Sequence, residues 1–304
     1  MNEGQRIKRQ TLRLLLVGGG LALALGLANA PLPTQATSDL PHQHMASGGE
    51  RGRQSAGTTG GWSDPVGIRP SEVITHYVFL PLIAKPKTCP PISGESYSSL
   101  SVNPPPTDRP AEIHADLNLA LRGYEPTDKY KGLMDFNGGF DPGAPQLPGL
   151  FADNRTGTFS AVYQIYDWNW DCNCRGGLVT SPEVTLAGLA VTPDETIHVP
   201  GSGYTIGSGY EVLVLYASME RITLNYTRDD TVSEGYTLHV ENVCVEPNLL
   251  ALYQAWNSAG RGQLPALRAG QAFGSALDDE IGVVIRDKGT SMDPRSRKDW
   301  WQGR

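Results

Sequence analysis

The sequence lacks the motifs that identify most common enzyme classes. Its 304 residues contain no nucleophile elbow, no phosphate-binding P-loop, no dinucleotide-binding glycine fingerprint and no catalytic-triad spacing. A basic patch is also missing, and the formal net charge of -7 argues against a nucleic-acid-binding surface. We therefore expect no nucleic-acid partner and no cofactor, and we predict no catalytic residue.

Long apolar runs are scarce, and the most prominent one lies near the N-terminus. Basic residues up to Arg13 precede an apolar segment at 14–27, and small residues follow at 28–30 and 34–36. This order is typical of a cleaved export signal, which we predict at 1–36. A retained membrane anchor is the alternative, although the run is shorter than the ~20 apolar residues that span a bilayer. We expect a secreted or cell-surface protein that meets the membrane only through this segment.

Apolar residues are also few in the segment that follows. Residues 37–88 are dominated by Ser, Gly, Gln, Thr and His, and they hold too little apolar surface to fold. We predict a disordered linker here. It contains an apolar segment at 73–86, which Pro81 and Pro86 restrict to an extended conformation. The remaining residues, 89–304, are predicted to form a single β-rich domain.

The domain is rich in strand signals and poor in helix signals. The 35 Gly and 23 Pro residues favour a loop-rich, mainly β protein. Alternation, or a high content of β-branched and aromatic residues, predicts strands at 161–170, 211–217, 221–226, 236–243 and 280–287. We expect a barrel-like or sandwich arrangement of antiparallel strands.

One short helix is predicted at 248–259. Pro247 suits a first helical turn, and Gly260 suits the position after a helix end. The apolar residues at helical spacing are Leu249, Leu252, Tyr253 and Trp256. The fold class is therefore mainly β with one short helix, preceded by the disordered linker.

The last third of the chain has the glycine and strand spacing of a known family. The matching residues are Gly270, Gly274, Ile285, Arg286, Gly289, Asp293 and Pro294. Two shorter pieces, 235–240 and 251–255, match further upstream. On these residues, the part from about 203 to 294 resembles the lysostaphin-type zinc endopeptidases. The resemblance implies their duplicated-hybrid-motif β fold and a setting in the bacterial cell envelope.

The resemblance breaks down at the positions that would bind zinc. The histidine positions of the family fall on Asn137, Ala255, Glu280 and Gly282, and its aspartate position falls on Asp141. A hydrolytic zinc ion needs three protein ligands and an open position for water. The resemblance therefore implies a degenerate scaffold without the metal chemistry. We hypothesise an exported, non-catalytic, envelope-associated protein that binds a cell-wall glycan, a peptide or a surface protein.

Two other functions stay open at this point. A metal-dependent hydrolase would need relocated ligands, and His114, Asp116, Asp141 and His239 have suitable groups. The first two fall on one face of a strand predicted at 112–118, where a simple hydrogen-bonded pair is the other interpretation. The third hypothesis is a purely structural or adhesive surface protein.

An aromatic row is the best candidate for a binding surface. In the strand predicted at 161–170, alternate residues from Val162 onward share one face, and these include Tyr166, Trp168 and Trp170. We interpret these three side chains as a candidate platform for sugar rings. Packing against the core is the alternative for aromatic residues in an apolar context.

Cysteine is rare, with four residues at Cys89, Cys172, Cys174 and Cys244. In an exported chain, disulfides are favoured over a zinc site. A direct bridge between Cys172 and Cys174 is expected to be strained, because one residue separates them. We therefore predict long-range pairs, in which Cys244 bonds to one of these two residues.

The chain ends on a basic segment, 295–304, that contains Trp300 and Trp301. Two arrangements are consistent with it. The tryptophans fold back onto the domain, or they form an exposed contact.

Overall fold

The computed structural model describes residues 88–304, and the predicted export signal, the linker up to residue 87 and the segment at 73–86 lie outside the described residues. The described part is mainly β, and the pairs between its strands are antiparallel. It contains one helix of more than seven residues. The predicted fold class is confirmed. Within the same residues, no helix is long and apolar enough to cross a membrane.

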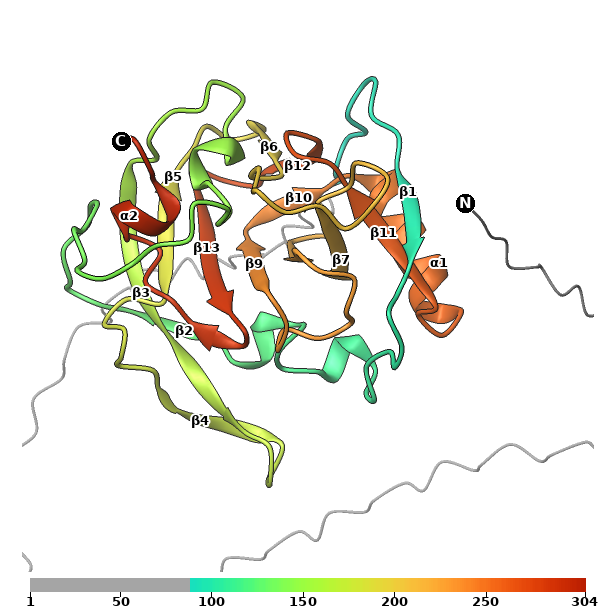
Figure 1. The fold of residues 1–304 in the computed structure, drawn as a ribbon, viewed down its shortest axis with the longest axis horizontal. Helices are drawn as coiled ribbons and strands as arrows, with labels where there is room; N and C mark the ends of the chain where they lie inside the picture. Colours follow the sequence, from blue (N-terminus) through green and yellow to red (C-terminus); the bar gives the residue numbers. More distant parts are fainter. Residues whose placement is uncertain (1–87) are drawn as a thin grey trace, which may run out of the picture. The chain divides into compact units, whose positions relative to one another are not determined.

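The strands form two sheets (Figure 1). The path through the larger sheet runs β1 (Ser98–Ser101), β11 (Gln263–Leu267), β7 (Val212–Ala217), β8 (Arg221–Asn225), β9 (Tyr236–Glu241), β13 (Glu280–Asp287), β5 (Leu186–Ala190), β3 (Phe159–Asn169) and β2 (Tyr124–Pro126). Off this path, β14 (Thr290–Ser291) pairs with β13, and β4 (Cys174–Leu178) pairs with β3. The smaller sheet has the order β10 (Val243–Val245), β12 (Ala272–Ala276) and β6 (Thr196–His198).

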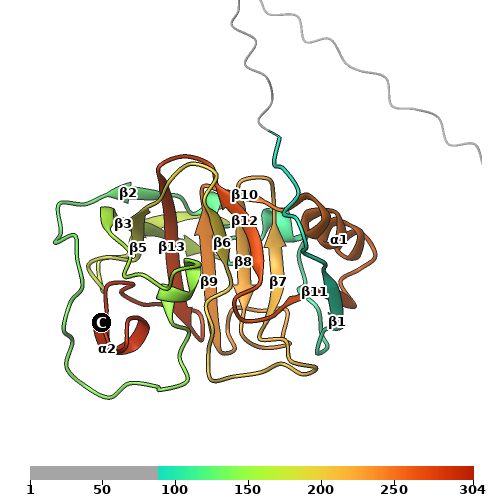
Figure 2. The same ribbon diagram turned by 90° about the horizontal axis from the view of Figure 1, so that it is seen from above.

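Helical segments are short and lie outside the sheets. The longer α-helix, α1 (Pro247–Ser258), contacts β11 and β7 near one edge of the larger sheet (Figure 2). A second helix, α2 (Arg297–Trp300), lies close to the C-terminus. Three single-turn 3-10 helices are η1 (Ala111–Ile113), η2 (Leu119–Leu121) and η3 (Leu147–Leu150).

The predicted elements agree with the structure except where the backbone bends. The predicted strand at 280–287 is β13, and the predicted helix at 248–259 is α1 within one residue at each end. The strand predicted at 236–243 is divided at Asn242, whose φ is +59°. Asn tolerates this left-handed conformation better than most residues. The bend lets the chain leave the larger sheet as β9 and enter the smaller sheet as β10.

The principal core lies between the two sheets. Strands β8, β9 and β13 alternate, so that one face of each is aliphatic and buried against the smaller sheet. The buried residues on this face are Ile222, Leu224, Leu238, Val240, Ile281, Val283 and Ile285. The smaller sheet contributes Ile197, Val243, Val245 and Phe273 to the same core. The arrangement is therefore sandwich-like.

The opposite face of these strands is also buried, although most of its side chains are polar. Cross-strand register places Thr223 beside His239, and Val284 beside His239 on the other side. The segment that contains η1 and η2 contacts this face, for example through the Leu117 carbonyl, which accepts a hydrogen bond from Thr223. Because both faces are covered, most residues of these three strands are buried.

The strand predicted at 112–118 is wrong. These residues form η1 and the turns that lead into η2. The Asn118 side chain accepts a hydrogen bond from the Ala120 amide, and His114 Nδ1 accepts one from the Asp116 amide. Such local hydrogen bonds between side chain and backbone compete with strand pairing. The predicted alternation therefore does not place His114 and Asp116 on a strand face.

The C-terminal tail folds back onto the domain. Trp300 and Trp301 are fully buried, and their indole N–H groups donate to the carbonyls of Asp293 and Pro294. The Trp301 ring also packs against Phe159 at 5.8 Å between ring centroids. Of the two arrangements left open by the sequence, the structure has the first.

We expect Trp301→Ala to destabilise the protein by about 3–5 kcal/mol, because it removes a fully buried indole and leaves a cavity. Urea unfolding followed by circular dichroism measures this change. Trp170→Ala is the matched control, since that indole is 39% exposed and its loss should cost below about 1 kcal/mol. Similar values for the two variants would contradict the buried position of the tail.

Candidate functional site

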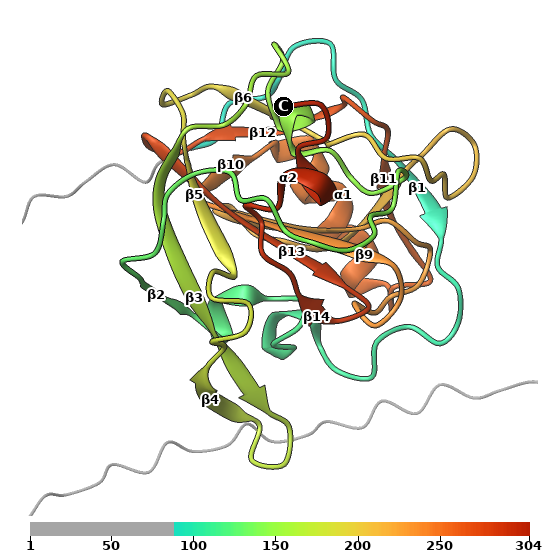
Figure 3. The same ribbon diagram turned by 60° about the vertical axis from the view of Figure 1, so that its left-hand side comes forward.

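The candidate binding surface lies on a hairpin that extends out of the larger sheet. Residues 159–163 of β3 pair with β5, and residues 163–165 pair with β2. Beyond this point, from Tyr166 to Asn169, the strand pairs with β4. The β3–β4 hairpin therefore projects away from the rest of the described domain (Figures 1 and 3).

A disulfide closes the tip of this hairpin. Cys172 and Cys174 are bonded to each other, with 5.3 Å between their Cα atoms, and Cys89 is bonded to Cys244. The prediction that Cys244 pairs with Cys172 or Cys174 is wrong. The φ of +50° at Asn173 turns the chain back on itself, which brings the two flanking Cα atoms within ordinary bonding range. All four cysteines are paired.

None of the three predicted platform residues is buried. Trp170 is 39% exposed, and Tyr166 and Trp168 are half-buried. Val162, at the start of the predicted row, packs in the principal core, where β3 pairs with β5. The three aromatic residues lie further along, on the part of the strand that extends into the hairpin with β4.

Arginine side chains lie against these aromatic rings. The Arg175 guanidinium lies 5.0 Å from the centroid of Tyr166, and the Arg109 guanidinium lies 5.0 Å from that of Trp170. These distances are in the range of cation–π attraction. Arg109 also donates a hydrogen bond of 2.7 Å to the Asn173 side chain at the tip. The hairpin is thus connected to the segment that precedes η1.

The other rings of the site contact one another through their edges. Trp168 and Trp170 are T-shaped with centroids 6.4 Å apart, and His114 meets Trp170 in the same way at 5.3 Å. Burial lowers the pKa of His114, partly offset by the nearby Asp116. At neutral pH, His114 is therefore an uncharged neighbour of the aromatic platform formed by Tyr166, Trp168 and Trp170.

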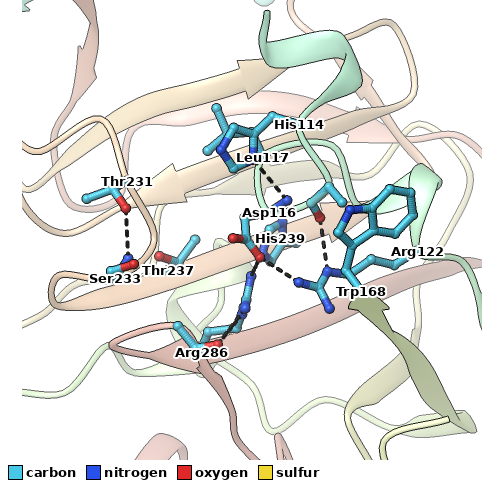
Figure 4. Close-up of polar contacts among 12 residues, drawn as sticks. His114, Asp116, Leu117, Arg122, Trp168, Thr231, Ser233, Thr237, His239 and Arg286 are labelled. Carbon is cyan, nitrogen blue, oxygen red and sulfur yellow. Dashed lines mark hydrogen bonds and ion pairs between the residues drawn. The ribbon is translucent and has the colours of Figure 1, made fainter. Parts of the chain in front are cut away.

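Asp116, the second proposed metal ligand, is held by two guanidinium groups (Figure 4). Its Oδ1 atom is 2.6 Å from Arg122 Nη2 and 2.8 Å from Arg286 Nη1. Burial raises the pKa of Asp116, but Arg286 and Arg122 outweigh this effect and lower it overall. Asp116 is accordingly an ionised acceptor whose partners are already present.

His239 and Asp141 are occupied elsewhere. The Thr223 hydroxyl donates to the Leu117 carbonyl at 2.7 Å and lies 3.0 Å from His239 Nδ1, so this nitrogen carries the proton and donates to Thr223. Asp141 accepts hydrogen bonds from the hydroxyls of Tyr204 and Tyr236, at 2.7 and 3.0 Å.

The structure does not assemble the four proposed ligands. Within residues 88–304, no group of three or more His, Cys, Asp or Glu side chains is arranged to hold a metal ion.

The five positions expected to correspond to the peptidase site are dispersed. Asn137 lines a cavity of about 520 Å³, and Asp141 lines another of about 280 Å³. Ala255 is exposed on α1. Glu280 and Gly282 share a third cavity of about 250 Å³. The structure therefore brings together two of the five.

Sequence reasoning missed two arginines at the aromatic platform and one ion pair in the sheet. Arg109 and Arg175 lie in a loop and on a second strand, and no local pattern connects them to the aromatic row. Glu241 is buried on β9 beside Arg221, a pairing that cross-strand register creates. Only the alternation of β8 and β9, taken together with their pairing, would have placed these two charges side by side.

Comparisons of the chain with protein-family models, curated proteins and solved structures found no match. The resemblance to lysostaphin-type endopeptidases therefore stays a prediction.

His239 makes stability depend on pH. Burial and the neighbouring Arg286 lower its pKa from 6.5 to about 3 in the folded protein. The unfolded chain therefore binds one more proton than the folded chain between these pH values. The free energy of unfolding should fall as pH drops from about 6.5 towards 3, by up to about 4 kcal/mol.

Urea unfolding of the protein and of His239→Gln at pH 7, 6, 5 and 4 measures this contribution. The Gln variant has no titrating ring, so we expect its stability to fall less steeply with decreasing pH. Carboxylates with a lowered pKa, such as Asp116, also contribute less to folding stability as pH falls, but they are present in both proteins. Equal slopes would mean that His239 does not titrate as proposed.

Proposed function

We propose that this protein is an exported, non-catalytic module that binds a cell-envelope glycan through the aromatic platform of its β3–β4 hairpin. The observation that carries the proposal is the placement of Tyr166, Trp168 and Trp170 at the surface of a projecting hairpin, outside both core clusters. Aromatic rings that lie half-buried or exposed on a projecting hairpin, outside the core, are typical of interaction sites.

The surroundings of the platform favour a glycan over an apolar partner. A sugar ring presents C–H groups to an aromatic face and hydroxyl groups to its polar neighbours. The exposed polar residues around the platform are Asp167, Asn169, Asp171, Asn173 and Arg175. Aromatic faces combined with such donors and acceptors match both properties of a sugar. Within residues 88–304, the exposed large aliphatic side chains are Ile113 and Met219, which are too few for the broad surface that an apolar partner would require.

The hairpin is also built to present the rings in a fixed arrangement. The Cys172–Cys174 bond closes its tip, and Arg109 connects that tip to the segment before η1. Rings held in place before binding lose less conformational freedom when a ligand binds. This smaller loss of conformational entropy matters for a glycan, because each sugar contact contributes little binding free energy on its own.

Features outside the platform support an envelope setting. The predicted export signal and the lysostaphin-type resemblance both favour a partner in the cell envelope. The paired cysteines are compatible with an extracellular protein. Both carboxylates of the alternative metal-dependent hydrolase are already engaged, Asp116 by two arginines and Asp141 by two tyrosines, which favours the binding role.

We expect the double variant Trp168→Ala/Trp170→Ala to bind glycan at least roughly tenfold more weakly, because two ring contacts of about 1 kcal/mol each are lost. Two assays measure this: co-sedimentation with insoluble peptidoglycan, and fluorescence titration with an N-acetylglucosamine tetramer. Circular dichroism checks that the variant is folded.

Phe140→Ala is the matched control, because that ring is 57% exposed and lies outside the hairpin. It should bind as the unmodified protein does. The proposal fails if the unmodified protein binds neither glycan, or if the double variant binds as well as the control. A purely structural or adhesive surface protein would give the first of these results.

A further inference from the structure

A concave site lies on the larger sheet, away from the hairpin tip. It is a cavity of about 250 Å³ whose lining includes Tyr124, Tyr163, Glu220, Arg221, Glu241 and Glu280. We refer to it as the acidic pocket. These residues come from β2, β3, β8, β9, β13 and the turn before β8, so the pocket is created by the sheet itself. The volume lies just below the roughly 300–1,000 Å³ of cavities that hold drug-sized ligands, so it suits a smaller molecule.

Two glycines make room for the carboxylates of the acidic pocket. Gly188 and Gly282 are paired in the register between β5 and β13. A Cβ atom at Gly188 would collide with the Glu280 carboxylate, and one at Gly282 would lie 3.3 Å from both Glu241 Cβ and Leu186. Both glycines have ordinary backbone angles rather than positive φ. The observed position of the Glu280 carboxylate therefore favours glycine at 188, and the crowding by Glu241 and Leu186 favours glycine at 282.

The Glu280 carboxylate is held by neutral donors. The Tyr163 hydroxyl donates to its Oε1 atom at 2.8 Å, and the Ser160 hydroxyl donates to Oε2. Burial raises the pKa of Tyr163, so this hydroxyl stays protonated at neutral pH and remains a donor. No basic side chain within residues 88–304 forms an ion pair with Glu280. The two hydroxyls fix the carboxylate in place without neutralising its charge.

Glu241 has one oxygen paired and one oxygen open. Arg221 Nε donates to Oε2 at 2.9 Å. In the described part of the chain, Oε1 has no hydrogen-bond partner, and it is not a fully buried atom. Because Glu241 as a residue is 3% exposed and lines the acidic pocket, this oxygen faces the cavity. Burial raises the pKa of Glu241, and Arg221 opposes that shift.

Aromatic rings complete the wall of the acidic pocket. Tyr124 and Tyr163 meet edge to face, with 5.2 Å between their centroids. The pocket thus combines three carboxylates, one guanidinium that is already paired and two phenol rings. Acidic groups repel an anionic ligand. A metal ion needs several converging ligands, and no such group exists among residues 88–304.

We propose that the acidic pocket binds a small organic ammonium group, with the cation between the Glu280 carboxylate and the rings of Tyr124 and Tyr163. A charged N–H donor and a carboxylate form a strong hydrogen bond. Tyrosine faces attract the same cation, and partial exclusion of water strengthens that attraction. The open Glu241 oxygen supplies a second acceptor for the ammonium protons. This site does not depend on glycan binding at the hairpin.

The proposal is tested with n-butylammonium as the probe and n-butanol as its uncharged counterpart. Titration into the ¹⁵N-labelled protein is followed by NMR. We expect saturable amide shifts centred on β9 and β13 with butylammonium, and at least tenfold weaker binding of butanol. Equal affinities of the two probes, or shifts centred elsewhere, would overturn the proposal.

Glu280→Gln should bind butylammonium about tenfold more weakly, because it keeps the shape of the side chain and removes its charge. Glu125→Gln is the matched control, since Glu125 also accepts a tyrosine hydrogen bond but lies outside the acidic pocket. Unchanged binding in Glu280→Gln would contradict the proposal. If that variant does not fold, the location of the shifts in the unmodified protein decides. The Trp168→Ala/Trp170→Ala variant should bind butylammonium normally, which separates this site from the glycan proposal.

Discussion

The Asp116 carboxylate joins three parts of the described domain. Arg286 on β13 and Arg122 after η2 both donate to it, although the two guanidinium groups repel each other. Arg122 also lies within hydrogen-bond distance of the Asp167 side chain, at the base of the projecting hairpin. The carboxylate therefore connects the central sheet, the covering segment and the hairpin. Breaking such a buried pair costs about 3–5 kcal/mol, because an unpaired charge is left inside the protein.

This network also explains how one face of the sheet can be polar and buried at once. Buried polar groups are costly unless each has a partner. The side chains of Asn225 and Thr237 bond to each other, and Thr223 connects His239 to the covering segment. His239 Nε2 is an exception, since it is buried without a partner in the described residues. A neutral ring tolerates that position, and a protonated ring would not. The same burial that fixes the fold thus limits its stability in acid.

Periodicity predicted the parts of the fold in which one face of an element packs on apolar side chains. The strand at 280–287 and the helix near 248–259 are of this kind, because Ile281, Val283 and Ile285 or Leu249 and Tyr253 carry the signal locally. The segment at 112–118 also alternates, but hydrogen bonds from Asn118 and His114 to nearby amides hold it in turns. Alternation alone does not show whether a neighbouring strand is available for pairing.

The candidate sites were predictable only in part, for a related reason. The aromatic row of β3 could be read from the sequence, yet the change of strand partners, from β5 and β2 to β4, decides which of its residues lie outside the core. The Cys172–Cys174 bond depends on the backbone angle of Asn173, and the pairing of Arg221 with Glu241 depends on strand register. Strand pairing sets the first and third of these features, and a local turn sets the second. Alternation within a single segment predicts none of them.

The two proposed sites share strand β3, and its course explains why they differ in character. Up to Ile165 the strand is flanked by β5 and β2, so Tyr163 is held against Glu280 within the sheet. After Tyr166 the strand pairs with β4, and its side chains are free of the core. A pocket with fixed charges therefore forms where the strand has two neighbours. The surface that we propose to bind a glycan lies where it has one. Arg122 contacts both the Tyr166 carbonyl and the Asp116 carboxylate. The strand therefore changes from a sheet strand to a hairpin strand at the residue where Arg122 connects it to Asp116.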